Sequence, residues 1–385
     1  MDLSFVNQNF NDYVSWRHHL HSHPELSFQE TNTSAFIATK LDEFGMPYKK
    51  LGLGIVAYFR SDSSSSSQGL ALRADIDALP IHELNDFKHK SVNEGVMHAC
   101  GHDGHTAMLL AAAHYVVNHK EEFADKQLYF IFQPAEEMGG GASQMIKEGL
   151  FSDFPISQVY GLHNWPGIAI GDFAIRPGPI MAAVDFFDLS ITGKGGHAAM
   201  PDLADDPIAA LGNIITQVLS LPNRSIDPSD ALVISFTSIE GGDSYNVIPS
   251  NLKIKGTMRY FNQDVYEIAK KKINDLVSAN CALHNLEYDF STYTTTAATI
   301  NHPRETETSI QVAKQIVKDQ LITDMHPSMG GEDFAYMLEA KPGSYIWMGN
   351  GSSASLHSPH YDFNDESITY GLGYWLALMK NHNVL

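Results

Sequence analysis

The sequence contains very little cysteine. Cys100 and Cys281 are the two cysteines among 385 residues. So few thiols cannot form the disulfide framework of a small secreted domain, and unpaired cysteines are typical of a reducing compartment. The N-terminal residues lack the basic start and the apolar stretch of a secretory signal peptide. The C-terminal residues NHNVL match no retention or lipidation signal. These absences predict a cytoplasmic protein.

Long apolar runs are also missing, and basic residues are scarce. No stretch approaches the roughly 20 apolar residues that cross a bilayer as a helix. The chain carries 25 Lys and Arg against 45 Asp and Glu, a formal net charge of −20 with histidine neutral. Because nucleic acids and anionic membranes repel so acidic a surface, the sequence predicts neither as a partner.

What the sequence does have is enough apolar mass for a large core. Hydrophobic residues make up 43% of the chain and charged residues 18%, which excludes a disordered chain and a coiled-coil rod. The length predicts two domains, or one large domain with an insertion. The 19 histidines are a further indication, because imidazole is the commonest metal ligand and a proton carrier at neutral pH.

In the first half of the sequence, apolar runs of strand length alternate with helical patterns. We expect strands over 54–60, 69–77, 127–132 and around 158–164, and a helix from His105. This alternation is typical of an α/β domain with a mixed, mostly parallel sheet and helices on both faces. The linker SDSSSSSQG, residues 61–69, is expected to be a solvated hairpin loop between the first two strands. Functional residues of such sheets collect beyond the carboxyl ends of the strands.

The pattern changes near Ala182. Phe187, Leu189 and Ile191 alternate with polar residues, as in a half-exposed antiparallel strand. Helices are expected over about 205–221 and 265–282, with strands over 232–239 and 252–260 and a last strand in LEYDFSTY. The order β-α-β-β-α-β predicts a ferredoxin-like α+β domain. We therefore expect residues 182–294 to form an inserted domain, and residues 1–181 and 295–385 to form the main domain.

The densest group of reactive side chains lies in HACGHDGH, residues 98–105. Cys100 and His102 are two residues apart, so in an extended loop both could reach one metal ion. The simpler interpretation is a polar helix cap, with Asp103 as the N-cap residue and a buried cysteine. Three histidines, a thiol and a carboxylate in so short a segment favour the metal site.

Further candidates follow three other expected strands. Glu136 and Glu137 come after a buried strand, where one carboxylate can bind metal while the other acts as a general base, although adjacent acids in loops are usually just solvated. His163 and His357 follow two more strands, in GLHNWP and SLHSPHYDF. Lone histidines are usually structural, but all these groups fall on one rim of the sheet. Imidazole, thiolate and carboxylate together suit zinc, manganese, cobalt or nickel.

Seven segments of the chain resemble successive motifs of one enzyme family. They are WRHHLHSHPELSFQE, ALRADIDALPI, HACGHDGHTAMLL, FQPAEEMGGGA, GLHNWP, GKGGHAAMP and GGEDFAYM. The family is the di-metal aminoacylase and carboxypeptidase superfamily. The branch is that of hippurate hydrolase, N-acyl-L-amino-acid amidohydrolases, N-acetyldiaminopimelate deacetylase and auxin-conjugate (IAA-amino acid) hydrolases. The resemblance covers nearly the whole chain, and this branch has a cysteine where the wider superfamily has a bridging aspartate.

The resemblance implies roles for particular residues of the main domain. Glu136 is implied as the catalytic base, taking a proton from a metal-bridged water as it attacks the amide. Asp77 is implied to orient a metal ligand; the simpler reading makes it a turn residue at a strand end. The resemblance also implies two divalent metal ions per subunit, which are Mn²⁺, Zn²⁺, Co²⁺ or Ni²⁺. The implied ligands are Cys100, His102, Glu137, His163 and His357.

For the inserted domain, the resemblance implies a lid that also forms a homodimer or tetramer. His197, in GKGGHAAMP, is implied to reach the partner subunit's active site and polarise the scissile carbonyl. Asn246 and Arg259 match positions that bind the substrate's carbonyl and carboxylate, although Arg259 could equally be an exposed cation at a strand end. A further substrate-side loop is implied for Gly330, Gly331 and Glu332.

The function expected from these residues is metal-dependent hydrolysis of the amide bond of N-acyl amino acids, with a small N-acyl amino acid as the partner. Two alternatives lie within the superfamily: a metallo-carboxypeptidase or dipeptidase, and an N-acetyldiaminopimelate deacetylase. A hydrolase with Cys100 as nucleophile and His98 or His102 as base is a third. A zinc-stabilised binding or scaffold protein is a fourth, but Glu136 beside a ligand disfavours it, because a structural site needs no base.

Overall fold

The computed structural model describes residues 3–60 and 69–381, and these residues form two compact units. The first unit consists of residues 1–180, 299–326 and 332–385, and the second of residues 181–298 and 327–331. The insertion expected over 182–294 lies within the second unit. That unit also includes the short segment with Gly330 and Gly331, which the sequence placed in the main domain.

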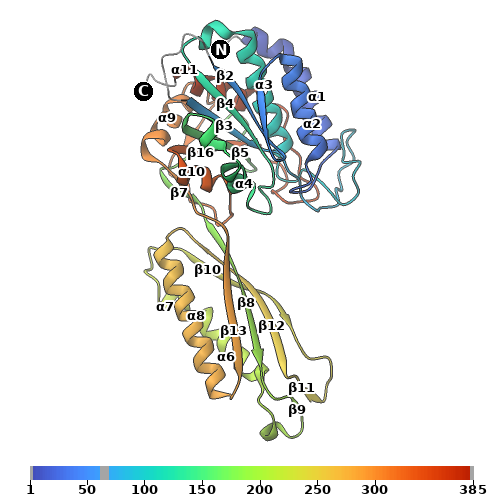
Figure 1. The fold of residues 1–385 in the computed structure, drawn as a ribbon, viewed down its shortest axis with the longest axis vertical. Helices are drawn as coiled ribbons and strands as arrows, with labels where there is room; N and C mark the ends of the chain where they lie inside the picture. Colours follow the sequence, from blue (N-terminus) through green and yellow to red (C-terminus); the bar gives the residue numbers. More distant parts are fainter. Residues whose placement is uncertain (1–2, 61–68, 382–385) are drawn as a thin grey trace. The chain divides into compact units, whose positions relative to one another are not determined.

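The first unit contains an eight-stranded sheet, helices and one small two-stranded sheet (Figure 1). Its helices are α1 (Leu3–Ser22), α2 (Thr31–Phe44), α3 (His102–Asn118), η1 (Lys120–Phe123), α4 (Gly141–Lys147), α5 (Leu150–Asp153), α9 (Pro303–Ala313), α10 (Ala335–Ala340) and α11 (Ser367–Asn381). Its strands are β1 (Tyr48–Leu51), β2 (Gly54–Arg60), β3 (Gly69–Asp75), β4 (Gln127–Gln133), β5 (Ile156–Trp165), β6 (Phe173–Ala174), β7 (Gly178–Met181), β14 (Thr299–Asn301), β15 (Leu321–Ile322) and β16 (Gly343–Gly349).

The large sheet is mixed, with a parallel centre. Its strand order is β1-β2-β4-β3-β5-β16-β6-β15. The neighbours β4, β3, β5 and β16 run parallel, whereas β1 and β2 pair antiparallel at one edge. The burial of β3 and β16 along their whole length fits strands that are covered on both faces. The predicted mostly parallel sheet is confirmed.

The expected hairpin between the first two strands is wrong. β2 and β3 do not pair with each other, because β4 lies between them and pairs antiparallel with β2 and parallel with β3. A polar linker between two apolar runs is equally compatible with a hairpin and with a connection that skips a strand, so the sequence could not distinguish them. Residues 61–68 of this linker lie outside the described residues.

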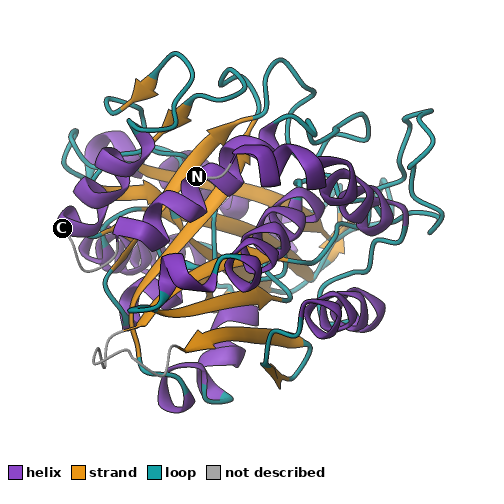
Figure 2. Cartoon of the chain, turned by 90° about the horizontal axis from the view of Figure 1, so that it is seen from above, coloured by secondary structure: helices purple, strands orange, loops and turns teal. Residues whose placement is uncertain are grey.

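Helices lie on both faces of the large sheet (Figure 2). Leu70 and Leu72 of β3 belong to the main hydrophobic core together with α3, around which α1, α2 and α11 pack. Arg73, the residue after Leu72, points to the opposite face and contacts Glu332, just before α10. Almost every residue of α3 from 102 to 116 is buried, which explains why its Ala- and Leu-rich sequence lacks a polar face.

α3 begins at His102, earlier than the expected start at His105. Gly101 is the N-cap residue and has a φ of 91°, which favours glycine. A Cβ atom added to Gly101 would lie 2.2 Å from Nδ2 of Asn164, so the close approach also requires glycine. The simpler interpretation, in which Asp103 caps this helix, is therefore wrong. Asp103 lies in the first turn instead, fully buried.

The second unit contains a four-stranded antiparallel sheet in the order β10-β12-β8-β13 and a two-stranded sheet of β9 and β11. Its strands are β8 (Ala183–Thr192), β9 (Gly196–His197), β10 (Leu232–Glu240), β11 (Val247–Ile248), β12 (Asn251–Tyr260) and β13 (Glu287–Thr296), and its helices are η2 (Pro201–Leu203), α6 (Pro207–Val218), α7 (Leu221–Arg224) and α8 (Gln263–Leu283). This order is that of the predicted ferredoxin-like domain. Phe187, Leu189 and Ile191 are buried in its core, as their alternation indicates.

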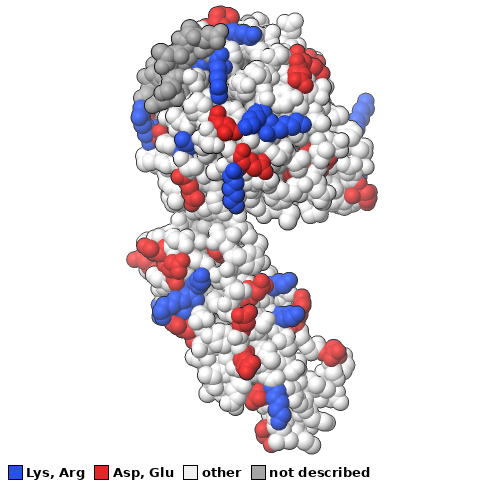
Figure 3. Space-filling view, viewed as in Figure 1, with Lys and Arg blue, Asp and Glu red and all other residues white. Residues whose placement is uncertain are grey.

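No helix among the described residues is both long and apolar enough to cross a membrane. On the face drawn in Figure 3, basic and acidic side chains are interspersed over each unit.

Candidate active site

Side chains able to bind metal gather at the carboxyl ends of four neighbouring parallel strands of the first unit. Cys100 and His102 come from the connection between β3 and α3, and Glu137 follows β4. His163 belongs to β5, and His357 follows β16. Because these strands are neighbours and run parallel, residues far apart in the sequence meet at one edge of the sheet.

The structure brings the five expected metal ligands together. The Cys100 sulfur lies 3.4 Å from Nε2 of His163. Glu137 lies between two histidines, with Oε1 3.9 Å from Nε2 of His102 and Oε2 3.4 Å from Nε2 of His357. Donor atoms of Cys100, His102 and Glu137 all lie within 4.8 Å of one another.

The residues at this point fit a divalent cation. Nε2 of His102 and Oε1 of Glu137 are buried atoms with no hydrogen-bond partner in the part of the chain that the structure describes. Buried polar atoms normally have a hydrogen-bond partner. Two neighbouring atoms that each have a free lone pair therefore indicate a cation that both can bind. A thiolate, imidazoles and a carboxylate form a donor set suited to zinc and similar borderline ions.

The electrostatics of the group agree with this fit. Burial raises the pKa of the Cys100 thiol well above its ordinary value, and Glu137 and Glu136 raise it further. Burial alone would lower the pKa of His102, but Asp75 and Asp77 raise it to about 10. Without a cation the site therefore retains protons. Metal binding to such a site releases them, because the ligands must be deprotonated.

Asp77 connects two of the ligands. Its Oδ1 lies 3.2 Å from Nδ1 of His102, and its Oδ2 accepts the backbone N–H of Glu137 at 3.0 Å. Ser27 Oγ donates to the same Oδ2 at 2.6 Å. Because the Asp77 carboxylate binds Nδ1 of His102, the other ring nitrogen, Nε2, faces Cys100 and Glu137. The same carboxylate also fixes the backbone of Glu137.

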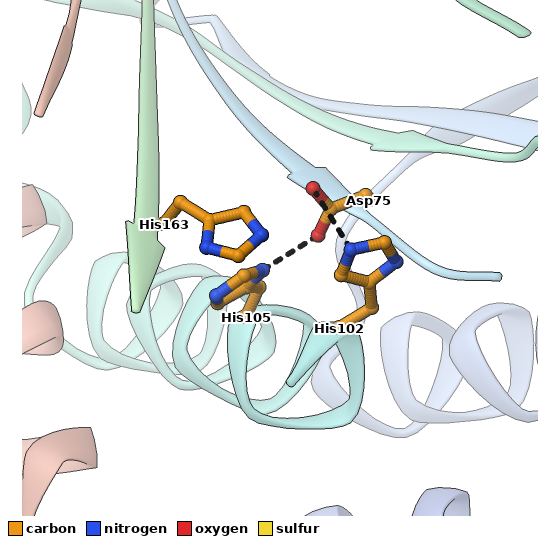
Figure 4. A group of neighbouring side chains, drawn as sticks. All are labelled: Asp75, His102, His105 and His163. Atoms are coloured by element: carbon orange, nitrogen blue, oxygen red, sulfur yellow. Dashed lines mark hydrogen bonds and ion pairs between the residues drawn. The ribbon is translucent and has the colours of Figure 1, made fainter. Parts of the chain in front are cut away.

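Three further residues behind the ligands were not predicted: Asp75 and His105 (Figure 4), and Asn164. Oδ1 of Asp75 lies 2.6 Å from Nδ1 of His105, and Oδ2 lies 3.7 Å from Nε2 of His102. The other ring nitrogen of His105 accepts the backbone N–H of Asn164 at 2.9 Å. The Asn164 side chain donates to the carbonyl of Cys100 at 2.6 Å. These three residues belong to the motifs RADID, CGHDGH and GLHN, which also contain expected site residues. Their presence in those motifs is the feature of the sequence from which they could have been predicted.

Glu136, the expected base, is half-buried beside other carboxylates. Its carboxylate, with those of Glu332 and Asp333, forms a group of oxygens within 4.8 Å of one another. Burial raises the pKa of Glu136 well above its ordinary value, and Glu332, Glu137 and Asp333 raise it further. A raised pKa strengthens a carboxylate as a proton acceptor, which suits a general base.

Glu332 lies in the core and not on an open loop. It is 1% exposed, its Oε1 lies 2.8 Å from Nη2 of Arg73, and it accepts a hydrogen bond from the Tyr345 hydroxyl. Arg73 also pairs with Asp75 at 2.7 Å and with Asp333 at 3.3 Å. This buried cation therefore holds the carboxylates that surround Glu136.

The remaining expected residues lie in the second unit, as two separate pairs. His197 is exposed in β9 and pairs with β11, and the carbonyl of Asn246 accepts the N–H of Ala198 at 3.0 Å. Arg259 lies near the end of β12 and donates from Nη1 to the carbonyl of Met329 at 3.0 Å, in the same short segment as Gly331. Arg259 is thus a half-buried, hydrogen-bonded side chain and not a free surface cation.

The two pairs lie toward opposite ends of the second unit's sheet. His197 follows the end of β8 at Thr192, which pairs with Asn251, the first residue of β12. Arg259 pairs with Val184, near the start of β8. Eight residues of extended strand, at about 3.3 Å per residue, separate these ends by roughly 26 Å.

Comparison with known proteins gives one family. Residues 71–381 match the family model described as peptidase family M20/M25/M40. The chain is 35% identical over 376 residues to IAA-amino acid hydrolase ILR1-like 4 of Arabidopsis thaliana, covering 94% of this chain and 84% of that protein. It is 34% identical to hippurate hydrolase of Campylobacter jejuni, covering 95% of each.

A solved structure agrees with this assignment. The crystal structure of the YXEP protein of Bacillus subtilis, described as a dinuclear metal-binding peptidase of the M20 family, has a TM-score of 0.84 and 30% sequence identity, covering 97% of this chain and 98% of that one. The chain belongs to peptidase family M20/M25/M40. It is a hydrolase that acts on amide bonds, and the family resemblance found in the sequence is confirmed.

Proposed function

We propose that this protein hydrolyses the amide bond of N-acyl amino acids. The observation that carries the proposal is the placement of Glu136 next to the donor group of Cys100, His102 and Glu137. A purely structural metal site would have no use for a half-buried carboxylate that lies beside the donor group and among other carboxylates. The relatives named for hydrolysis of hippurate and IAA-amino acids support the same substrate class.

The ligands assigned to two divalent cations are Cys100, His102, Glu137, His163 and His357. Bound there, such cations polarise a substrate carbonyl and make water nucleophilic at neutral pH. Glu136 accepts the proton of the attacking water and then donates it to the leaving amine. Asp77 and Asp75 hold His102 in place while this happens.

The second unit is proposed to bind substrate and to join subunits. Arg259 is assigned to the substrate carboxylate, with Gly331 in the adjacent segment, while His197 and Asn246 are assigned to the carbonyl. The separation of roughly 26 Å between the two pairs, from the strand rise of about 3.3 Å per residue, supports an arrangement in which His197 serves the partner subunit's site. A homodimer or tetramer follows from that assignment.

The identity of the cations and the compartment complete the proposal. The mixed sulfur, nitrogen and oxygen donors favour Zn²⁺, Mn²⁺, Co²⁺ or Ni²⁺ over magnesium or calcium. Both cysteines are buried and free, which supports a cytoplasmic location.

A hydrolase with Cys100 as nucleophile is disfavoured by the surroundings of the sulfur. Burial raises the pKa of this thiol, whereas an activated cysteine needs a lowered pKa. The sulfur lies 3.4 Å from Nε2 of His163, whereas that alternative requires His98 or His102 as the base.

The test is amide hydrolysis by metal-stripped protein after adding back Mn²⁺, Zn²⁺, Co²⁺ or Ni²⁺ singly. The substrates are hippurate, IAA-amino acids, N-acetyl amino acids, N-acetyldiaminopimelate and simple dipeptides. We expect metal-dependent cleavage of N-acyl amino acids and weak or no cleavage of dipeptides. Preferential cleavage of dipeptides would replace the proposal with a metallopeptidase, and activity that survives chelation would overturn the metal mechanism.

A further inference from the structure

The loop between β4 and α4 carries both Glu136 and Glu137, and buried carboxylates from other parts of the chain hold it. Each accepts one or two backbone N–H groups of the loop: Glu30, Asp77 and Asp333. Asp77 is already part of the ligand arrangement, and Asp333 holds the far end of the loop, next to α4. Glu30 acts on the other side of the base, at the residue before it.

The contact of Glu30 is with the backbone of Ala135. Oε1 of Glu30 accepts the N–H of Ala135 at 2.8 Å, and the carbonyl of Ala135 accepts the N–H of Gly141 at 3.2 Å. Ala135 has a φ of 52°, a left-handed conformation that residues with a Cβ atom rarely adopt. Such a conformation persists only where the surroundings enforce it. The direction of the next side chain, Glu136, depends on it.

Besides the N–H of Ala135, the Glu30 carboxyl group interacts with the backbone N–H groups of Phe28 and of Glu30 itself, and neither of these two contacts reaches the loop that carries Glu136. The residue is fully buried, and its Oε2 atom has no hydrogen-bond partner among the described residues. Burying an oxygen without a partner is unfavourable, so an apolar side chain of similar size would pack here at lower cost. What the carboxyl group contributes outside its own turn is the hydrogen bond to Ala135.

We propose that Glu30 is a positioning residue for the hydrolysis, which fixes Ala135 in its left-handed conformation and thereby aims Glu136. The inference rests on the proposed function, in which Glu136 is the base. Glu30 precedes residue 71, where the match to the family model begins.

The experiment compares Glu30→Ala, which removes the acceptor, with Glu30→Gln, whose amide oxygen can still accept from Ala135. Asp172→Ala is the matched control. Asp172 is also a buried carboxylate that accepts two backbone N–H groups, those of Asp319 and Gln320 at 3.0 and 2.9 Å, but none of its contacts involves the site.

Steady-state kinetics of the metal-loaded enzyme give the first readout. We expect kcat of Glu30→Ala to fall about 10- to 100-fold with KM changed less than about twofold, because a small misplacement of a reacting group has effects of this size. Glu30→Gln should recover kcat to within about threefold of the unmodified enzyme, and Asp172→Ala should leave it unchanged. A folded Glu30→Ala with undiminished kcat, or a Glu30→Gln as slow as Glu30→Ala, overturns the proposal.

Amide hydrogen exchange of residues 133–142 gives a second readout that needs no activity. Glu30→Ala should exchange faster than the unmodified protein in this segment, and Glu30→Gln and Asp172→Ala should not. If the unmodified protein cleaves no N-acyl amino acid, the proposed function fails while this comparison still decides the role of Glu30. Equal exchange in the unmodified protein and Glu30→Ala shows that Glu30 does not hold the loop.

A double-mutant cycle with Ala135→Gly identifies the route of the effect. Glycine adopts a left-handed conformation without the Cβ penalty, so Glu30→Ala should accelerate exchange less in the Gly background than in the unmodified one. Strictly additive effects would show that Glu30 does not act through the conformation of residue 135.

Discussion

The two units of this protein bury charge very differently. Among the described residues of the second unit, the one buried charged side chain is Asp185, which accepts hydrogen bonds from the hydroxyls of Tyr260 and Thr294 at 2.6 and 2.8 Å. The first unit buries many, among them Arg17, Glu30, Arg73, Asp75, Asp77, Asp103, Glu332 and Asp333. Both units have complete hydrophobic cores, so packing alone does not require the buried charges.

The difference follows from the architecture and from the chemistry assigned to each unit. A parallel sheet covered on both faces can place polar groups only at the ends of its strands, where they must satisfy one another. The antiparallel sheet of the second unit leaves part of its surface to solvent, so its charged residues stay there. The buried charges of the first unit are therefore associated with the site. Removing one of them should lower activity or stability, whereas removing a surface charge of the second unit should not.

The largest expected effect is the loss of the base. Glu136→Gln keeps the shape of the side chain but cannot accept the proton, so kcat should fall about 10²- to 10⁴-fold while the protein still binds its metal ions. Kinetics on the preferred N-acyl amino acid and metal analysis of the same preparation check both parts. Glu240→Gln, an exposed glutamate at the end of β10, is the control in the second unit. Unchanged turnover in Glu136→Gln would refute its assignment.

The next effect is on stability. Arg73→Leu removes the cation that pairs with Asp75, Glu332 and Asp333, and breaking a buried charge network usually lowers the free energy of unfolding by about 3–5 kcal/mol. Lys253→Gln, on an exposed position of β12, should change it by less than about 0.5 kcal/mol. Urea denaturation of both variants measures the contrast. If the two variants are equally stable, the buried charges do not distinguish the units.

A smaller effect is expected on metal affinity. Asp75→Asn weakens the support of His105 and His102, and loss of such an outer contact typically lowers metal affinity about 10- to 100-fold. Competition with a chelating dye measures the change. Asp185→Asn alters the matching buried aspartate of the second unit and should leave metal affinity unaltered. A similar loss in both variants would mean that general destabilisation, and not the site, is responsible.

The smallest effect is a pH dependence of stability. Burial raises the pKa of Glu30 from 4.5 to about 7, and Asp77 also raises it. Because the buried carboxyl group is favoured in its protonated form, its contribution to the free energy of unfolding declines as the pH rises from 4.5 to about 7. Glu30→Gln has no such group, so its stability relative to the unmodified protein should increase across this range and then level off. Denaturation of metal-free protein at several pH values tests this, and parallel profiles would contradict it.

Much of this arrangement could be predicted from the sequence. Apolar runs of the right length gave the strands of the large sheet, and the alternation at Phe187, Leu189 and Ile191 gave the change to an antiparallel domain. The five proposed ligands were recognisable because they lie at the ends of those strands or in the connections that follow them. Patterns of this kind involve residues that are close together in the sequence, so they can be recognised without the structure.

The rest depends on contacts between distant segments. Nothing near Glu30 indicates that it meets Ala135, more than a hundred residues away, and nothing near Glu332 indicates that it meets Arg73. The misplaced hairpin has the same origin, because strand order depends on β4, which follows in the sequence. A polar side chain that is buried by a remote partner looks, in the sequence, like one on the surface.

The position of β16 in the sheet determines the order in which the two units can fold during synthesis. β16 lies between β5 and β6 in the sheet, and His357 follows it, yet both come after the whole second unit in the sequence. By then the second unit has been completed and can fold, whereas the first unit still lacks a central strand. A nascent chain at that point carries four of the five proposed ligands on an unfinished sheet. Metal binding, and with it any activity, is expected only after β16 and His357 have been synthesised.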